Sequence, residues 1–139
     1  MIVFFDTSAL FKRYVQETGS KVVLNYCDRA TKIILASITT FEFQTTLCRR
    51  LHEQTLDRQS FNAVLRDWMM DAPFYQFVPL DSVLETAAMQ VSRHSTLKTL
   101  DVIQLASASV ANPDYFLVAD KKLFTTAQKI LQQTKVVLV

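Results

Sequence analysis

The sequence predicts an α/β protein, a three-layer α/β/α sandwich built around a mostly parallel sheet of five strands. Two observations lead to this prediction. Short apolar runs alternate with helical patterns along the 139 residues, and these runs are apolar at consecutive positions, as expected of strands that are covered on both faces. Hydrophobic residues make up 50% of the chain, which is enough for a substantial core.

Five apolar runs are expected to form the strands. Each is rich in β-branched or aromatic residues and is bounded by polar or turn residues. The runs are Met1–Phe5, Ile33–Ala36, Phe77–Leu80, Tyr115–Ala119 and Val136–Val139. Because parallel strands leave their carboxyl ends along one edge of a sheet, the residues that follow these strands are expected to meet there.

Helices are expected between the strands, where apolar residues recur three and four positions apart. They are a short helix containing Ala9, Leu10 and Tyr14, and helices over Ser20–Ala30, Thr39–Leu51, Phe61–Met69, Ser82–His94, Thr99–Val110 and Lys121–Gln132. The fourth of these carries the stripe Phe61, Leu65, Trp68 and Met69, which is more typical of a core or a subunit contact than of a cofactor site. If exposed, this stripe would supply the face of a homodimer.

Composition indicates a single domain over residues 1–139, since one Gly and three Pro leave no material for a linker. Met1–Phe5 is halted by Asp6 and has no basic segment before it, so neither a signal peptide nor a membrane span is expected. The two cysteines, Cys27 and Cys48, lack metal-ligand spacing and suit a reducing, cytoplasmic location. A chain with one Gly also has no glycine-rich phosphate loop, which excludes that nucleotide-binding class.

Four acidic residues carry the chemistry of this sequence. Asp6, Glu42, Asp101 and Asp120 each lie in or just before the first turn of an expected helix. Carboxylates gathered at one sheet edge repel one another unless a cation binds them. An all-oxygen set is the ligand chemistry of Mg²⁺ or Mn²⁺, so a divalent metal site is expected.

Each acid also has a structural explanation, because helix N-termini favour carboxylates. Thr39 as N-cap would make Glu42 the glutamate of a capping box. Asp101 would lie in the first turn behind Thr99, and Asp120 could cap the last helix.

Two observations oppose capping as the whole explanation. Thr7 or Ser8 could cap the first helix, which would leave Asp6 free for another role. Asp101 lies in a helix that is apolar on most sides, so it is expected to be buried and to need a partner.

Four segments, in order, resemble the PIN-domain family, and most closely the VapC-type toxins of prokaryotic toxin–antitoxin pairs. They are Phe4–Leu10, Ser37–Glu42, Leu97–Ala106 and Phe116–Leu123, which cover the chain nearly end to end. Each carries one of the four acids. The resemblance implies a PIN-like fold in which the strands ending at Asp6 and Asp120 lie side by side.

The resemblance implies a metal-dependent endoribonuclease. Asp6, Glu42, Asp101 and Asp120 would be both the catalytic residues and the ligands of one or two Mg²⁺ or Mn²⁺ ions. Water as the nucleophile would leave a 5′-phosphate and a 3′-hydroxyl. Thr7 and Ser8 would supply hydroxyls around the metal, and Lys12, Arg13 and Lys98 would contact the RNA backbone.

The resemblance also implies a cognate VapB-like antitoxin. Its tail is expected to place an Arg or Lys among the four acids, in competition with metal. The remaining partners expected are the RNA substrate and a second copy of the chain, with no membrane.

Two departures and two alternatives stay open. Gln104 stands where relatives often have His, and Val118 where a Ser or Thr is common, which could weaken metal binding. A catalytically inactive PIN-fold scaffold is one alternative. A Mg²⁺-dependent phosphatase or phosphotransfer domain is another, although the haloacid-dehalogenase kind needs a second Asp where Ser8 stands, and a receiver needs an acidic pair that is missing.

Overall fold

A five-stranded sheet lies at the centre of the structure, a computed structural model that describes residues 1–139. The strands are β1 (Ile2–Phe5), β2 (Lys32–Ala36), β3 (Gln76–Val78), β4 (Tyr115–Val118) and β5 (Lys135–Leu138). Their order across the sheet is β3-β2-β1-β4-β5, and every neighbouring pair is parallel. The predicted fold class is therefore confirmed, and the sheet is parallel throughout.

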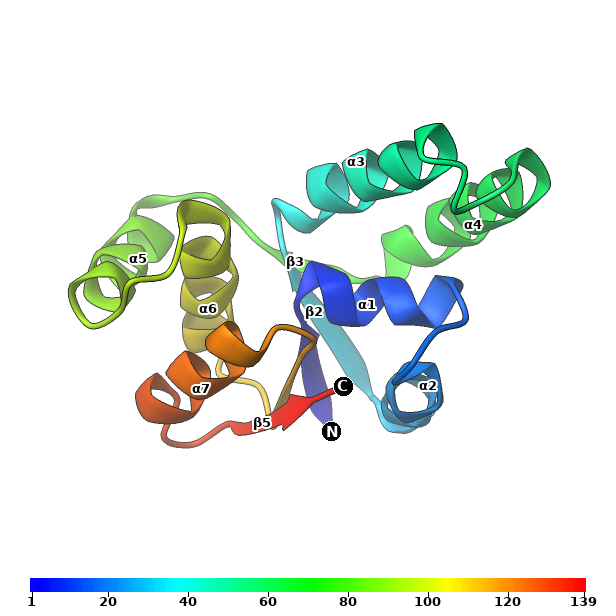
Figure 1. Ribbon diagram of the computed structural model, residues 1–139. Helices are drawn as coiled ribbons and strands as arrows, with labels where there is room; N and C mark the ends of the chain where they lie inside the picture. Colours follow the sequence, from blue (N-terminus) through cyan, green and yellow to red (C-terminus); the bar gives the residue numbers. More distant parts are fainter.

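Helices cover both faces of the sheet (Figure 1). On one face lie α5 (Ser82–Arg93), α6 (Thr99–Ala111) and α7 (Lys121–Ile130). On the other lie α1 (Thr7–Tyr14), α2 (Ser20–Arg29), α3 (Thr39–His52) and α4 (Arg58–Asp71), the last followed by a short 3₁₀ turn at Ala72–Phe74. No helix of the chain has both the length and the apolar character needed to cross a membrane.

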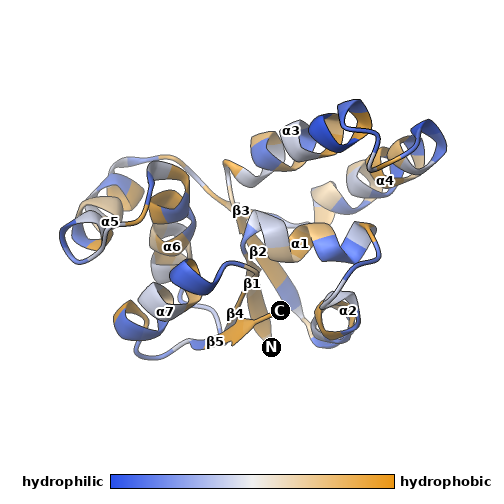
Figure 2. Ribbon diagram, viewed as in Figure 1, coloured by the Kyte–Doolittle hydropathy of each residue, from blue (hydrophilic) through white to orange (hydrophobic).

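The sheet separates two hydrophobic cores, because successive strand residues point to opposite faces. In β1, Phe4 packs into the core beneath α5, α6 and α7, whereas Val3 and Phe5 pack toward α1 to α4. In β4, Phe116 and Leu117 divide in the same way. Figure 2 shows the strands as the hydrophobic centre of the molecule. This two-sided burial explains why the strands are continuous apolar runs.

The aromatic stripe of α4 is mainly core and not an open dimer face. Trp68 is only 3% exposed and stacks on Phe43 of α3, with ring centroids 4.4 Å apart. Phe61 and Leu65 are partly buried against the same core, and only Met69 of the four stripe residues is exposed. The surface predicted for a homodimer is therefore wrong, because the stripe is used to hold α3 and α4 together. The homodimer itself stays a prediction.

The order in which strands are added to the sheet reverses at β1. From β1 it proceeds through β2 to β3 on one side, and then returns to place β4 and β5 on the other. The loops that follow β1 and β4 therefore leave the same edge at adjacent positions and diverge to opposite faces. In parallel α/β sheets this is the position where ligands bind.

Candidate active site

Asp6 occupies the point where β1 and β4 diverge. Its backbone N–H donates to the carbonyl oxygen of Leu117 (3.0 Å). Its carboxylate accepts hydrogen bonds from two backbone amides, Ala9 N–H at Oδ1 (2.6 Å) and Ala119 N–H at Oδ2 (3.4 Å). The side chain is 4% exposed. Asp6 is itself the N-cap of α1, so the expectation that a neighbouring hydroxyl would cap this helix is wrong.

Burial makes Asp6 an unusual carboxylate. Loss of hydration raises its pKa from 3.8 to about 7, and the charges of Asp101 and Glu42 add to the effect, whereas the two backbone amides oppose it. Burial disfavours the charged form of an acid, and a nearby like charge does the same. A buried, ionisable group at a ligand-binding edge marks a functional site more than a helix cap.

Glu42, in the first turn of α3, points toward α1 and α6. Its Oε1 accepts a hydrogen bond from the hydroxyl of Thr7 (2.8 Å) and another from Nε2 of Gln104 (2.7 Å). Thr39 is the first residue of α3, and no side chain caps this helix. The capping-box explanation for Glu42 is therefore wrong, because its carboxylate is held by side chains from two other helices.

Gln104 contacts the Glu42 carboxylate, which sequence reasoning did not predict. It is 2% exposed, and besides Glu42 its Nε2 lies 2.9 Å from Oγ1 of Thr7 and 3.2 Å from Oγ1 of Thr39. Its Oε1 is buried and has no hydrogen-bond partner. The available signal was its position three residues after Asp101, which places both side chains on one side of α6. Gln104 thus joins α1, α3 and α6 around the Glu42 carboxylate.

Asp101, in the first turn of α6, and Asp120, directly before α7, are the other two predicted acids. Desolvation raises the pKa of Asp101, with further contributions from the charges of Asp120 and Glu42, while Lys122 and Lys98 act in the opposite direction. Asp101 is half-buried, less than expected, because the first turn of α6 lies at the open sheet edge. Asp120 is exposed and caps α7 by accepting the N–H of Leu123 (2.8 Å). Capping and site membership coincide in this residue.

The structure brings the four predicted acids to one edge of the sheet, and we call them the carboxylate cluster (Asp6, Glu42, Asp101 and Asp120). The pKa values of two of these acids, Asp6 and Asp101, are raised by burial and further by the charges of their acidic neighbours. No three acidic, His or Cys side chains, however, converge closely enough to hold one ion together. Both oxygens of Asp6, and one oxygen each of Glu42 and Asp120, accept hydrogen bonds from the protein.

The model of the PIN domain family matches residues 3–130, and all four acids lie within this span. The chain belongs to the PIN-domain family. Among similar proteins, Ribonuclease VapC45 of Mycobacterium tuberculosis (strain CDC 1551 / Oshkosh) is 27% identical over 128 residues, which cover 91% of this chain and 89% of the relative. The resemblance to PIN domains that the sequence suggested is thus confirmed.

Solved structures share the fold of this PIN domain at low sequence identity. FitAcB from Neisseria gonorrhoeae superposes with a TM-score of 0.71 at 16% identity, covering 96% of this chain and 95% of that one. VapBC2 from Rickettsia felis, bound to a DNA fragment from its promoter, superposes with a TM-score of 0.67 at 11% identity, covering 100% and 99%. These similarities support the fold and not the chemistry.

The cations expected to contact RNA have different surroundings in this PIN domain. Lys98 is exposed close to Asp101. Lys12 donates to two backbone carbonyl oxygens, those of Thr18 (2.8 Å) and Val139 (2.9 Å). Arg13 instead forms an ion pair with Asp71 of α4 (3.0 Å). This ion pair joins α1 to α4 and occupies the charge of Arg13, whereas Lys98 keeps its charge free.

The hydroxyls near the cluster also differ from one another. Thr7 is buried and donates to Glu42, as expected of a residue that orients a ligand. Ser8 is exposed and makes no hydrogen bond within the chain. Val118, which offers no hydroxyl, is fully buried in the core between the sheet and α7. Of the two hydroxyls predicted near the metal, only that of Thr7 therefore contacts an acid of the cluster.

Proposed function

We propose that this PIN domain is a metal-dependent endoribonuclease and the toxin of a VapBC-type toxin–antitoxin pair. The observation that carries the proposal is Asp6, a buried carboxylate at the divergence of β1 and β4 with three further acids around it. A relative that bears the name ribonuclease supports RNA as the substrate. A metal-ion site suits these residues because a cation would remove the mutual repulsion of the acids.

The donor chemistry of the carboxylate cluster fits Mg²⁺ or Mn²⁺. All available groups are hard oxygen donors, with no thiol or imidazole among them. The buried Oε1 of Gln104 has no partner within the protein, which also suits a site that is completed by a ligand. Asp6, Glu42, Asp101 and Asp120 would hold the ion after small side-chain rotations, since no three of them converge beforehand.

A bound divalent ion supplies positive charge that neutralises the scissile phosphate and makes water a better nucleophile. The side chains around it set the geometry. Thr7 and Gln104 fix the Oε1 atom of Glu42 and leave its second oxygen free. Burial raises the pKa of Asp6 to about 7 in the metal-free protein, and a bound cation would favour the ionised form that holds it. Attack by water would leave a 5′-phosphate and a 3′-hydroxyl.

Metal binding should stabilise the folded protein independently of any RNA. Adding Mg²⁺ or Mn²⁺ is expected to raise the melting temperature in a concentration-dependent way, with about 2.7 kcal/mol of added stability when the ion reaches 100 times its dissociation constant. Thermal unfolding followed by circular dichroism measures the shift, and cleavage of a fluorescent RNA in the same buffers measures activity.

Two variants control the metal experiment. Asp101→Asn should lose most of the melting shift together with cleavage. Asp81→Asn should keep both, because Asp81 caps α5 away from the cluster and Asn is an equally good cap. A melting curve that is unchanged up to millimolar metal would count against the site.

A cognate antitoxin is the expected partner. Solved structures with this fold include the VapBC2 complex, and an acidic cluster is a natural receptor for an Arg or Lys from a neighbouring protein. If the chain is a toxin, expressing it alone should stop growth in a bacterial host, whereas the Asp6→Asn variant and co-expression with the adjacent antitoxin gene should not. Colony counts and optical density after induction measure this difference.

A catalytically inactive PIN-fold scaffold is the second candidate. The observation in its favour is the lack of any three converging ligands. Normal growth with abundant soluble wild-type protein, together with no metal effect on melting, would favour this scaffold over the ribonuclease.

A further inference from the structure

A groove of about 180 Å³ opens between α1 and α3 beside the carboxylate cluster. We call it the α1–α3 groove. One end is lined by Thr7, Ser8 and Ala119, which adjoin Asp6 and Glu42 through hydrogen bonds and sequence. The other end is lined by Lys12, Arg49 and Arg50, with Glu17 between them. The groove thus leads from the acids to a group of cations.

Helical periodicity explains why these side chains share one wall. Thr46, Arg49 and Arg50 follow Glu42 by four, seven and eight residues on α3, so all lie on the same side of the helix. Ser8 and Lys12 are four residues apart on α1 and face the same space. Seven residues of α-helix span about 10 Å. A single phosphate therefore cannot contact both Glu42 and Arg49, and the cationic end is a separate subsite.

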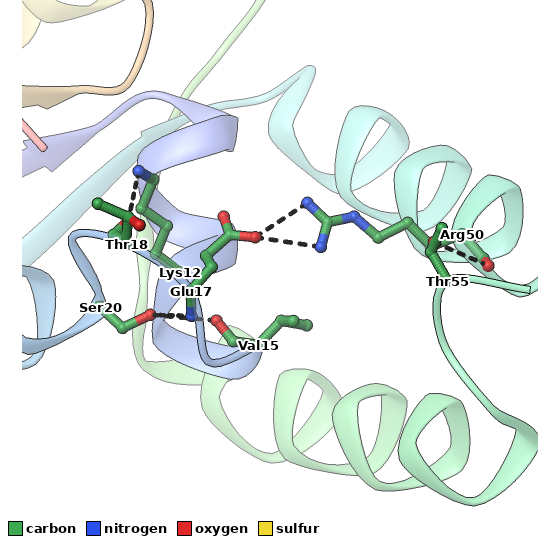
Figure 3. A network of polar contacts seen from close by, with 7 residues as sticks. All are labelled: Lys12, Val15, Glu17, Thr18, Ser20, Arg50 and Thr55. Carbon is green, nitrogen blue, oxygen red and sulfur yellow. Dashed lines mark hydrogen bonds and ion pairs between the residues drawn. The ribbon is translucent and has the colours of Figure 1, made fainter.

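The groove has an excess of positive charge. Arg50 donates from both terminal nitrogens to Oε2 of Glu17 (3.2 Å each), as Figure 3 shows, and its guanidinium lies 4.5 Å from the ring centroid of Phe11. Lys12 donates to the main-chain oxygens of Thr18 and of Val139, the last residue of the sequence. Arg49 is exposed, and its guanidinium makes no ion pair or hydrogen bond within the chain. Two arginines against the one side-chain carboxylate of Glu17 leave the groove attractive to an anion.

Neutral donors are also free in this groove. The hydroxyls of Ser8 and Thr46 make no hydrogen bond within the chain, although both residues line the groove. A phosphate with several acceptor oxygens matches a free guanidinium together with free hydroxyls. A carboxylate partner would use the guanidinium but fewer of these donors.

We propose that the α1–α3 groove binds a backbone phosphate of single-stranded RNA next to the one being cleaved, with Arg49 as its main charged contact and Ser8 and Thr46 as neutral donors. This inference rests on the proposed ribonuclease function and adds the path of the substrate. Arg50 is paired with Glu17, and this ion pair limits how tightly the groove binds RNA.

The test measures binding of a short fluorescent single-stranded RNA by anisotropy in the Asp6→Asn background with Mg²⁺, so that the RNA stays intact. Arg49→Gln should weaken binding about fivefold and lower the magnitude of the log K against log[salt] slope by about 0.7, the value for one phosphate contact. Arg49→Lys should retain the slope. In the cleavage-competent protein, Arg49→Gln should raise KM with little change in kcat.

Two further variants make the result specific. Arg29→Gln removes the same charge from an exposed position at the end of α2, next to the start of β2 and so at the opposite sheet edge, and should leave binding unchanged. Glu17→Gln should tighten binding and steepen the salt slope, because it releases Arg50. Equal effects of Arg49→Gln and Arg29→Gln would overturn the groove while leaving the ribonuclease standing. A wild-type protein that neither binds nor cleaves RNA would overturn both.

Discussion

Replacing Asp6 with Asn is expected to abolish RNA cleavage and, at the same time, to stabilise the metal-free protein above neutral pH. The pKa of Asp6 is about 7 in the folded state and near 3.8 as a free side chain. Between these values the folded protein binds more protons than the unfolded chain, so stability falls as the pH rises through this window. Above about pH 7 the folded protein has lost up to about 4 kcal/mol of its free energy of unfolding through this ionisation.

Asn removes this ionisation and still caps α1, since Asn and Asp are equally good N-caps. Melting temperatures of the wild type and Asp6→Asn, measured in chelator at pH 5 and pH 8, should therefore differ more at pH 8. Asp81→Asn is the matched control, because Asp81 makes the same N-cap contact in α5, to the N–H of Leu84 (2.9 Å), but is exposed. If the melting temperature of Asp6→Asn depended on pH as that of the wild type does, ionisation of Asp6 would not destabilise the folded protein.

Replacing Gln104 with Leu is expected to have the next largest effect. The substitution keeps the volume close to that of Gln but removes the amide that donates to Glu42 and contacts Thr7 and Thr39. Buried oxygens left without a donor cost about 1–3 kcal/mol. Cleavage should fall by about 10- to 100-fold, the usual effect of losing a group that orients a metal-binding carboxylate.

Urea unfolding and single-turnover cleavage measure these two effects separately. Gln104→His is the control, because an imidazole N–H can replace the amide that donates to Glu42. Gln104→His should therefore recover most of the activity lost in Gln104→Leu. If Gln104→Leu cleaves RNA as well as the wild type, Glu42 does not depend on Gln104 for its orientation.

The fold could be predicted because its signals are local. Val3, Phe4 and Phe5 are all apolar, and only a strand buried on both faces requires this. The structure shows Phe4 and its two neighbours in different cores. The order of the strands, in contrast, came from the resemblance, since no local pattern in β1 states that β4 pairs with it across more than a hundred residues.

The gathering of the four acids at one sheet edge was predicted from the sequence, but the side chains that hold them were not. Capping signals were misleading in opposite directions at Asp6 and Glu42: the first does cap its helix and the second does not. The difference depends on which side chains arrive from distant helices, and that is decided by tertiary packing. Gln104 was noted only as a departure from His. Its contact with Thr7 joins residues 97 positions apart, which no spacing along one helix predicts.

The central position of β1 in the sheet determines when the carboxylate cluster can form during synthesis of the chain. The contact between Asp6 and Ala119 spans 113 residues. Asp6, the first of the four acids to be synthesised, therefore makes this contact only when nearly the whole chain has been synthesised. Ribosomes add about 5–20 residues per second, and pairings between distant strands form late in folding. A nascent chain therefore carries Asp6 for most of its synthesis without a neighbouring β4, and the complete carboxylate cluster first exists after Asp120 has left the ribosome.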